Sequence, residues 1–358
     1  MKYYMPARVY AEENCIANHA EEICSLGTHA YLITGRSSAE KNGSLDDVKA
    51  ILENAGIPYE HFNEIEENPS VDTIMKAVYI GLDEHVDFVI GIGGGSPMDA
   101  AKAVAMMVCQ KEKRASYLYE KGSDEALPLV LIPTTCGTGS EVTGVSVLTR
   151  HDLSTKLSMF HSVFADLALL DGKYLTSLPH SVLADTTMDA LAHCMESYIN
   201  ADATVYSRMC ADAGLKLWGK SKDVIQGKRE AQPADYLNML HASAMAGMAI
   251  AQTGTSLPHG LSYTVTYQTH MPHGKACGYF LPGYLREASA KDAAHVLKKA
   301  GFASLDKLEK YYQKTSRPEE LPVKVLETGI QEILQSPGRL AKVPFAVDEA
   351  MLRRMARL

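Results

Sequence analysis

The sequence FVIGIGGGSPMDAAKAVA, residues 88–105, joins a strand to a helix through three glycines. Residues 87–92 form a short apolar run that predicts a buried strand, and the Ala-rich residues 100–105 favour a helix. Glycines at such a junction let the backbone approach a phosphate, and free N–H groups at the helix start point toward the anion. Because Ser96 replaces the third glycine of the dinucleotide-binding pattern, a tight turn without a ligand remains open for this loop alone.

A second loop rich in glycine and hydroxyl residues follows the apolar run at residues 127–132. It reads PTTCGTGSE over residues 133–141, and its hydroxyls come from Thr134, Thr135, Thr138 and Ser140. Ligands of open parallel sheets gather outside the carboxyl ends of the strands. Two such loops at one sheet edge predict a ligand that carries phosphate.

The surrounding pattern separates the chain into two parts. Strands expected at residues 30–34, 87–92 and 127–132 alternate with helices expected at 45–54 and 73–82, which indicates βαβ units and a parallel sheet. After residue 180 the chain is rich in helical sequence up to about residue 253, and more helix follows from residue 282. We therefore expect an α/β domain at residues 1–178 and an all-helical domain at residues 179–358.

Composition narrows the possible functions of this 358-residue chain. Lys and Arg number 35 against 43 Asp and Glu, so the net charge of −8 argues against a broad nucleic-acid surface. Seven dispersed cysteines without a CxxC pair are typical of reduced thiols in a cytoplasmic protein. The N-terminal residues lack the apolar run of a signal peptide, and no apolar run is long enough for a membrane span.

Four side chains in the helical half are candidate metal ligands. Asp189 and His193 are four residues apart and project from one helix face, while His259 and His273 each lie between Pro and Gly. One carboxylate and three imidazoles suit Fe²⁺, Zn²⁺, Co²⁺ or Mn²⁺ and leave space for a substrate oxygen. The spacing alone leaves open a shared metal site or unrelated structural roles, and His270 is a nearby competitor.

The combination of these motifs resembles the iron-containing alcohol dehydrogenase family over nearly the whole chain. The matching segments are GGGSPMDAAK (93–102), PTTCGTGSEVT (133–143), MDALAH (188–193) and the PHG that contains His273. The resemblance implies a Rossmann-like dinucleotide-binding domain, a helical domain of the dehydroquinate synthase-like architecture and a divalent metal. It also implies metal ligands at Asp189, His193, His259 and His273, and cofactor contacts at Gly94, Gly95, Ser96, Asp99, Thr134, Thr135, Ser140 and Lys156.

The chain departs from the family pattern at three positions. Tyr263 stands where a further His is common, so a proton path would use water or the tyrosine hydroxyl. Cys136 stands where Ala is usual, and Asp185 stands where a small residue is usual. The expected activity is hydride transfer between NAD(P)(H) and a small alcohol or aldehyde. A glycerol dehydrogenase-like enzyme, a dehydroquinate synthase-like cyclase and a non-catalytic nucleotide-binding regulator remain alternatives.

The sequence after the first buried strand bears on cofactor choice. An Asp at this point accepts hydrogen bonds from the ribose 2′-hydroxyl of NAD and repels the 2′-phosphate of NADP. Here Gly35 is followed by Arg36, Ser37 and Ser38, which donate hydrogen bonds to phosphate well. An ordinary polar turn is the alternative, but we expect NADP(H) to be preferred over NAD(H). The resemblance also implies a homodimer or larger homo-oligomer, with a strand near residues 7–10 as a candidate contact.

Overall fold

The computed structural model describes residues 3–153 and 155–358. Its described residues form two compact units, one α/β and one helical. The α/β unit consists of residues 5–135 and 140–178, and the helical unit contains residues 179–358. Residues 136–139, the middle of the second glycine-rich loop, group with the helical unit. The loop therefore belongs to both units, which the sequence does not predict.

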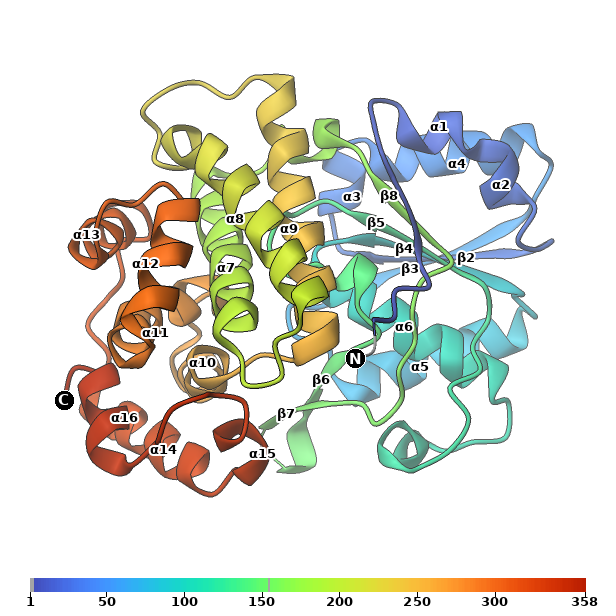
Figure 1. Cartoon of the computed structure of the whole chain (residues 1–358). Helices are drawn as coiled ribbons and strands as arrows, with labels where there is room; N and C mark the ends of the chain where they lie inside the picture. Colours follow the sequence, from blue (N-terminus) through green and yellow to red (C-terminus); the bar gives the residue numbers. More distant parts are fainter. Residues whose placement is uncertain (1–2, 154) are drawn as a thin grey trace. The chain divides into compact units, whose positions relative to one another are not determined.

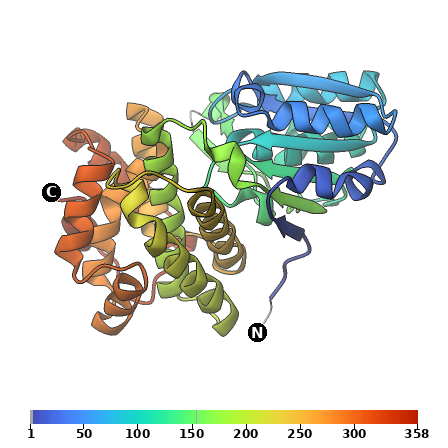
Figure 2. The ribbon, with the colours of Figure 1, turned by 90° about the horizontal axis from the view of Figure 1, so that it is seen from above.

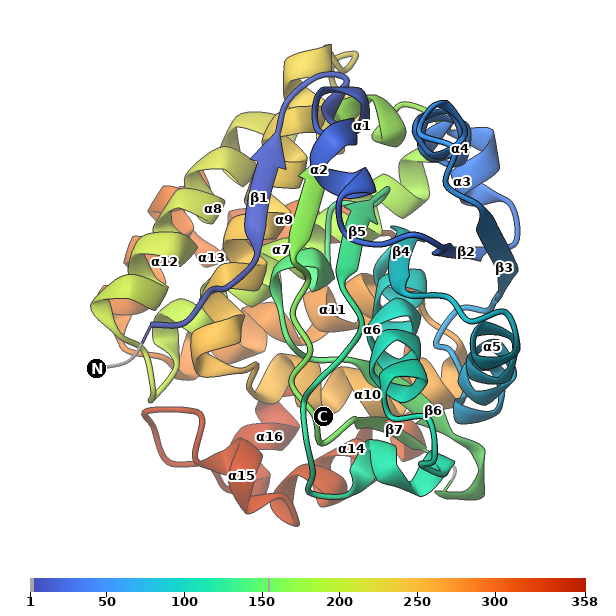
Figure 3. The same cartoon turned by 90° about the vertical axis from the view of Figure 1, so that its right-hand side faces the viewer.

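A six-stranded parallel sheet is the centre of the α/β unit (Figures 1 and 3). Its order is β1-β8-β5-β4-β2-β3. The strands are β1 (Arg8–Ala11), β2 (Ala30–Gly35), β3 (Tyr59–Ile65), β4 (Phe88–Gly93), β5 (Leu129–Pro133) and β8 (Leu167–Leu170). A separate antiparallel hairpin is formed by β6 (Val147–Arg150) and β7 (Thr155–Ser158). The expected parallel α/β fold with a helical second part is confirmed.

Alternate residues of the strands enter two cores, one on each face of the sheet. Tyr31 and Ile33 of β2 pack with helices α5 and α6, whereas Ala30 and Leu32 pack with α1, α2 and α4. This alternation follows from the two-residue period of a strand. The helices of this unit are α1 (Cys15–Asn18), α2 (Ala20–Cys24), α3 (Ser38–Lys41), α4 (Ser44–Asn54), α5 (Val71–Asp83) and α6 (Gly95–Cys109).

Two strands of the main sheet escape prediction from sequence. The β3 sequence YEHFNEI is mostly polar because β3 lies at an edge of the sheet and buries only Phe62 and Ile65. The strand β8 has only four residues and lies between irregular segments. The other edge strand, β1, pairs with β8 of its own chain.

The helical unit contains no strand in residues 179–358, all of which are described (Figure 2). The long helices α7, α8 and α9 pack against one another, and α10 and α11 follow. The helices are α7 (His180–Ile199), α8 (Val205–Ile225), α9 (Pro233–Thr253), α10 (Leu257–Thr269), α11 (His273–Glu287), α12 (Ala290–Lys299), α13 (Leu305–Thr315), α14 (Val323–Leu334), α15 (Pro337–Leu340) and α16 (Glu349–Met355). In the described residues, no helix is both long and apolar enough to cross a membrane.

Candidate metal and cofactor sites

The helix α7 carries the first two candidate ligands. It contains neither Gly nor Pro from residue 180 to residue 199, and its Ala, Leu and Met residues favour helix. Asp189 and His193 are buried on one face, with His193 Nε2 3.9 Å from Asp189 Oδ1. The other ring nitrogen of His193 lies 3.3 Å from the carbonyl oxygen of Gly137. This contact orients the ring toward Asp189.

The next two candidate ligands stand near the starts of α10 and α11. Pro258 occupies the first turn of α10, where its missing N–H costs no hydrogen bond, and His259 follows it. His259 Nε2 is 3.2 Å from Asp189 Oδ1, and His273 Nε2 is 3.7 Å from the same oxygen. The rings of His193 and His259 stack at 4.3 Å between centroids. The structure thus brings the three predicted histidines together around Asp189, the fourth predicted ligand.

The electrostatics of this cluster keep Asp189 ionised. Burial alone raises the pKa of a carboxyl group. At Asp189 this effect is outweighed by His193, His273 and His259, which lower the pKa well below its usual range. The cluster therefore holds a negative oxygen among imidazole nitrogens.

Glu196 is a buried part of the cluster that the sequence did not reveal. Its Oε1 contacts Nδ1 of His259 in a short hydrogen bond. Its Oε2 accepts hydrogen bonds from the backbone N–H and the hydroxyl of Ser256 at 2.7 and 2.9 Å. A carboxylate on Nδ1 fixes the ring and presents Nε2 toward a metal. Glu196 follows His193 by three residues, so the helix period placed it on the right face, but its partner could not be predicted.

Cys277 is a second residue that the sequence analysis missed. It is buried one turn after His273 in α11, and its Sγ lies 3.7 Å from His273 Nε2. The ligand atoms of Asp189, His259, His273 and Cys277 all lie within 4.8 Å of one another. Oxygen, nitrogen and sulfur donors in this arrangement, in which only His273 is partly exposed, fit a divalent transition metal.

His270, the alternative candidate ligand near His273, does not join the cluster. It is exposed at the end of α10 with φ 58°, a left-handed conformation that terminates the helix. Tyr263, by contrast, stacks on the ring of His273 with 5.7 Å between centroids. The guanidinium of Arg339 lies over the ring of Tyr263, 4.8 Å from its centroid. Tyr263 therefore lies beside one candidate ligand.

In the α/β unit the two glycine-rich loops lie against each other. The backbone N–H of Thr134 donates to the carbonyl of Gly93 at 2.8 Å. A Cβ atom on Gly94 would lie 3.1 Å from the hydroxyl of Thr135, so glycine permits this close approach. Gly94 caps α6, whose first residues are Gly95 and Ser96. The N-terminus of α6 and the end of β5 thus form one surface of backbone N–H and hydroxyl groups.

Asp99 and Lys102 of α6 hold the second loop. The carboxylate of Asp99 accepts hydrogen bonds from the Ser140 hydroxyl at 2.6 Å and from the Val147 N–H at 2.9 Å. Lys102 is fully buried, and its Nζ donates to Ser140 Oγ, Thr143 Oγ1 and the carbonyl of Val145. Burial lowers the pKa of Lys102 to about 8, although Asp99 opposes this shift. Both residues therefore act on the loop through its hydroxyls.

Asn68 connects two more predicted cofactor residues. Its backbone N–H donates to the hydroxyl of Ser96 at 3.0 Å, and its Oδ1 accepts from Lys156 Nζ at 2.8 Å. The left-handed φ of 57° at Asn68 allows this double contact. Lys156 on β7 is thus held near the glycine loop. The sequence does not point to Asn68.

The turn after β2 is open to solvent. Arg36, Ser37 and Ser38 are exposed, and Gly35 is the last residue of the strand. Arg36 has no ion pair or hydrogen bond among the residues described here.

The hydroxyl residues of the second glycine-rich loop are divided between the two units. Thr138 groups with the helical unit, whereas Thr134, Thr135 and Ser140 group with the α/β unit.

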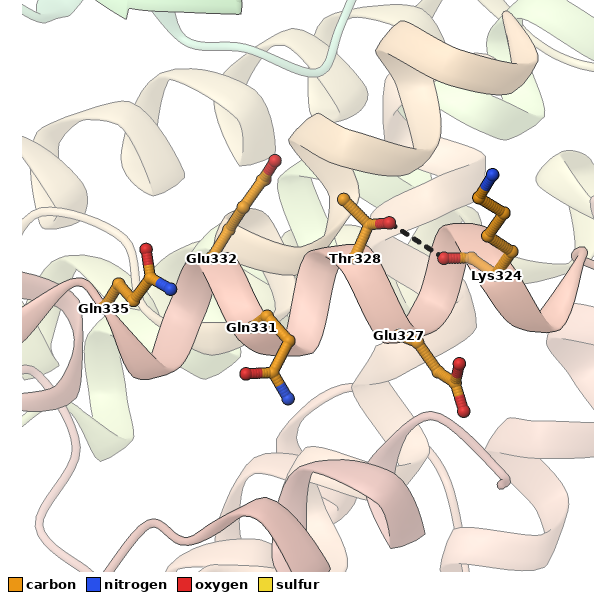
Figure 4. A pocket seen from close by; sticks show the side chains of 6 residues that line it. All are labelled: Lys324, Glu327, Thr328, Gln331, Glu332 and Gln335. Atoms are coloured by element: carbon orange, nitrogen blue, oxygen red, sulfur yellow. Dashed lines mark hydrogen bonds between the residues drawn. The ribbon is translucent and has the colours of Figure 1, made fainter.

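A shallow pocket along α14 lies outside both clusters (Figure 4). Charged and amide side chains line it, and the Thr328 hydroxyl bonds back to the carbonyl of Lys324 at 2.9 Å. This is the pattern of a solvated helix face. The pocket holds none of the candidate ligands, so the site is defined by the side-chain clusters above.

Comparison with known proteins relates both units to one family. Residues 6–172 match the family model described as iron-containing alcohol dehydrogenase, and residues 183–321 match its C-terminal model. The chain is 31% identical to "Long-chain-alcohol dehydrogenase 1" of Geobacillus thermodenitrificans, over 93% of this chain and 90% of that protein. It is 26% identical to "NADPH-dependent butanol dehydrogenase" of Clostridium saccharobutylicum, over 93% and 88% of the two chains.

A solved structure gives the same result. The iron-containing alcohol dehydrogenase of Thermotoga maritima superposes with a TM-score of 0.90 at 36% sequence identity. The match covers 99% of this chain and 98% of that chain.

Proposed function

We propose a metal site and a cofactor surface for this chain, which belongs to the iron-containing alcohol dehydrogenase family. The chain is a metal-dependent alcohol dehydrogenase or aldehyde reductase. We assign its metal to Asp189, His193, His259 and His273. The convergence of His259 Nε2 and His273 Nε2 on Asp189 Oδ1, at 3.2 and 3.7 Å, is the observation that supports this assignment most strongly.

The protein's side chains prepare the helical unit for a cation. The ionised Asp189 supplies a negative oxygen, and Glu196 fixes the ring of His259 through Nδ1. A divalent metal such as Fe²⁺ or Zn²⁺, with a bound nicotinamide cofactor, supplies Lewis acidity and hydride transfer. Burial of the cluster keeps bulk water from Asp189 and His259. We propose a small alcohol or aldehyde as the substrate, in line with the relative named as a butanol dehydrogenase.

Tyr263 is our candidate for proton transfer. It replaces the His that the family often carries four residues after the third ligand, and its ring lies against His273. A phenol hydroxyl both donates and accepts a hydrogen bond, so it can hold a proton between the site and solvent. Tyr263→Phe removes this hydroxyl while it keeps the ring contact, so we expect a lower turnover with unchanged metal content. Unchanged turnover in this variant would exclude the role.

For the cofactor we propose the surface formed by the two glycine-rich loops and the turn after β2. Free N–H groups at the start of α6 suit the pyrophosphate. The exposed Arg36 and the absence of a carboxylate at Gly35 favour the 2′-phosphate of NADP(H) over the bare ribose of NAD(H). One relative at 26% identity is named as NADPH-dependent, which agrees with this preference. The test is kcat/KM for NADPH and NADH with one aldehyde.

The activity and the metal assignment are tested together. We expect the purified protein to consume reduced nicotinamide with members of an aldehyde panel, followed by near-ultraviolet absorbance. His259→Ala should lose metal content and turnover together without unfolding. The control is His270→Asn, because Asn tolerates the left-handed conformation at this exposed position. Full metal content in His259→Ala would contradict the assignment, and a cyclase or regulator would give no net cofactor oxidation.

Assembly and compartment are further proposals. In the order of the described strands, β1 is an end strand of the main sheet (Figure 3), and this supports a homodimer or larger oligomer, because the outer side of an edge strand is a ready surface for association. Light scattering that shows a monomer at micromolar concentration would contradict it. We also propose a cytoplasmic location, because seven dispersed cysteines without a CxxC pair are typical of reduced thiols.

A further inference from the structure

Cys277 has the geometry of a metal ligand, although no role follows for it from the proposed site. It is buried on α11, and α11 places it one turn after His273 so that both side chains lie on one helix face. Its Sγ is 3.7 Å from His273 Nε2 and belongs to the group of four ligand atoms that lie within 4.8 Å of one another. His193 is not a member of that group.

Three distances within the group lie close to those between ligands of one small cation. Metal–nitrogen and metal–oxygen bonds of about 2.1 Å and a metal–sulfur bond of about 2.3 Å place neighbouring ligand atoms about 3.0 to 3.6 Å apart, for angles of about 90° to 110° at the metal. The observed separations from His259 Nε2 to Asp189 Oδ1, and from His273 Nε2 to that oxygen, are 3.2 and 3.7 Å. The separation from Cys277 Sγ to His273 Nε2 is 3.7 Å. The thiol thus lies at ligand distance from its neighbour.

We propose that Cys277 adds a sulfur ligand to the divalent ion that we assign to Asp189, His193, His259 and His273. The inference rests on the proposed metal site. On metal binding the S–H bond of Cys277 breaks, the sulfur keeps the electron pair and donates it to the metal, and the proton leaves to solvent. No electron is transferred, so the step needs no oxidant or reductant. A thiolate makes the donor set softer and favours Zn²⁺ or Co²⁺ over Mn²⁺.

Cobalt substitution tests the ligand directly. The metal-free protein is titrated with Co²⁺, and its visible and near-ultraviolet spectrum is recorded. Co²⁺ bound by oxygen and nitrogen shows weak visible bands, and a thiolate adds an intense sulfur-to-cobalt band in the near ultraviolet. We expect this band in the unmodified protein and its loss in Cys277→Ser and Cys277→Ala. Cys210→Ser is the control, because Cys210 is another buried thiol of the helical unit that lies outside the ligand group.

A second measurement needs no variant. X-ray absorption of the unmodified Zn²⁺ protein should show one sulfur scatterer at about 2.3 Å. Visible cobalt bands without the near-ultraviolet band, a band that persists in Cys277→Ser, or the absence of a sulfur scatterer would each overturn the role of Cys277 while leaving the metal site intact. Failure of the unmodified protein to bind Co²⁺ or Zn²⁺ at all would overturn the metal site and this inference with it.

Discussion

Glu196 of α7 reaches across to α10 and holds the ring of His259 by its Nδ1 atom. The same carboxylate also binds the Ser256 backbone and hydroxyl at the start of α10. Burial raises the pKa of Glu196, but the neighbouring His259 outweighs this and lowers it overall. The charged carboxylate therefore fixes both the orientation of His259 and the start of the helix that carries it.

Glu196→Gln should weaken metal binding without unfolding the protein. The amide keeps the size of the side chain but removes the negative charge of the carboxylate beside Nδ1 of His259. Loss of such a partner behind a metal ligand typically lowers metal affinity about 10- to 100-fold. Equilibrium dialysis against Zn²⁺ measures the change. The control is Glu332→Gln, since Glu332 also accepts a hydrogen bond from α10, from Thr264 Oγ1 at 2.5 Å, but contacts no proposed ligand. Equal affinities in the two variants would contradict the positioning role.

Lys102→Met should destabilise the α/β unit strongly. Methionine fills a similar volume but leaves the Ser140 hydroxyl and the Val145 carbonyl without their donor, and Asp99 without its cation at 3.7 Å. Removing one partner of a buried pair costs about 3 kcal/mol or more. The control Lys76→Met breaks the exposed ion pair with Glu64, which is worth less than about 1 kcal/mol. Urea unfolding compares the two, and similar midpoints would rule out an anchoring role.

Glu141→Gln should stabilise the protein increasingly as the pH rises. Glu141 is buried in the second loop, and neither carboxylate oxygen accepts a hydrogen bond of normal geometry from the described residues. Burial raises its pKa from 4.5 to about 7, while its own backbone N–H and Lys102 oppose the shift only in part. The unfolded chain therefore releases this proton at lower pH than the folded chain, and stability falls as the pH rises through this window.

The variant has no proton to release at this position, so its free energy of unfolding should rise relative to that of the parent between about pH 5 and about pH 8. The linkage between pKa and stability sets an upper limit of about 3 kcal/mol on this difference. Urea unfolding of both proteins at the two pH values measures it. Parallel stability curves for the parent and the variant would contradict the raised pKa.

The helical period and the turn residues marked the four proposed ligands as candidates only. Asp189 and His193 share a helix face by their spacing alone, and His259 and His273 stand beside the prolines that begin α10 and α11. The convergence of three helices on Asp189 is a tertiary contact, however, and only the resemblance to a family pointed to it. For that reason Glu196 and Cys277, whose partners lie on other turns or other helices, escaped prediction.

The fold, too, could be predicted from sequence only where it does not depend on tertiary contacts. The buried strands β2, β4 and β5 have continuous apolar sequences, and the structure places each within two residues of the predicted bounds. The edge strand β3 alternates polar and apolar residues only weakly, so its pairing with β2 decides its conformation. Asn68 likewise binds Ser96 and Lys156 through a left-handed backbone conformation that no sequence pattern announces.

Gly35→Asp should shift cofactor preference from NADPH toward NADH. A Cβ at Gly35 would have Ile65 O at 3.5 Å and Pro97 Cγ at 3.7 Å as its nearest neighbours, which are ordinary contacts, so the new side chain fits. Its carboxylate would accept hydrogen bonds from the ribose 2′-hydroxyl and repel a 2′-phosphate beside Arg36. We expect the ratio of kcat/KM for NADPH to that for NADH to fall at least about tenfold, equivalent to about 1.4 kcal/mol. Gly35→Asn has the same shape without the charge and should shift the ratio much less. A parent protein that prefers NADH, or a Gly35→Asp variant with an unchanged ratio, would show that this turn does not select the cofactor.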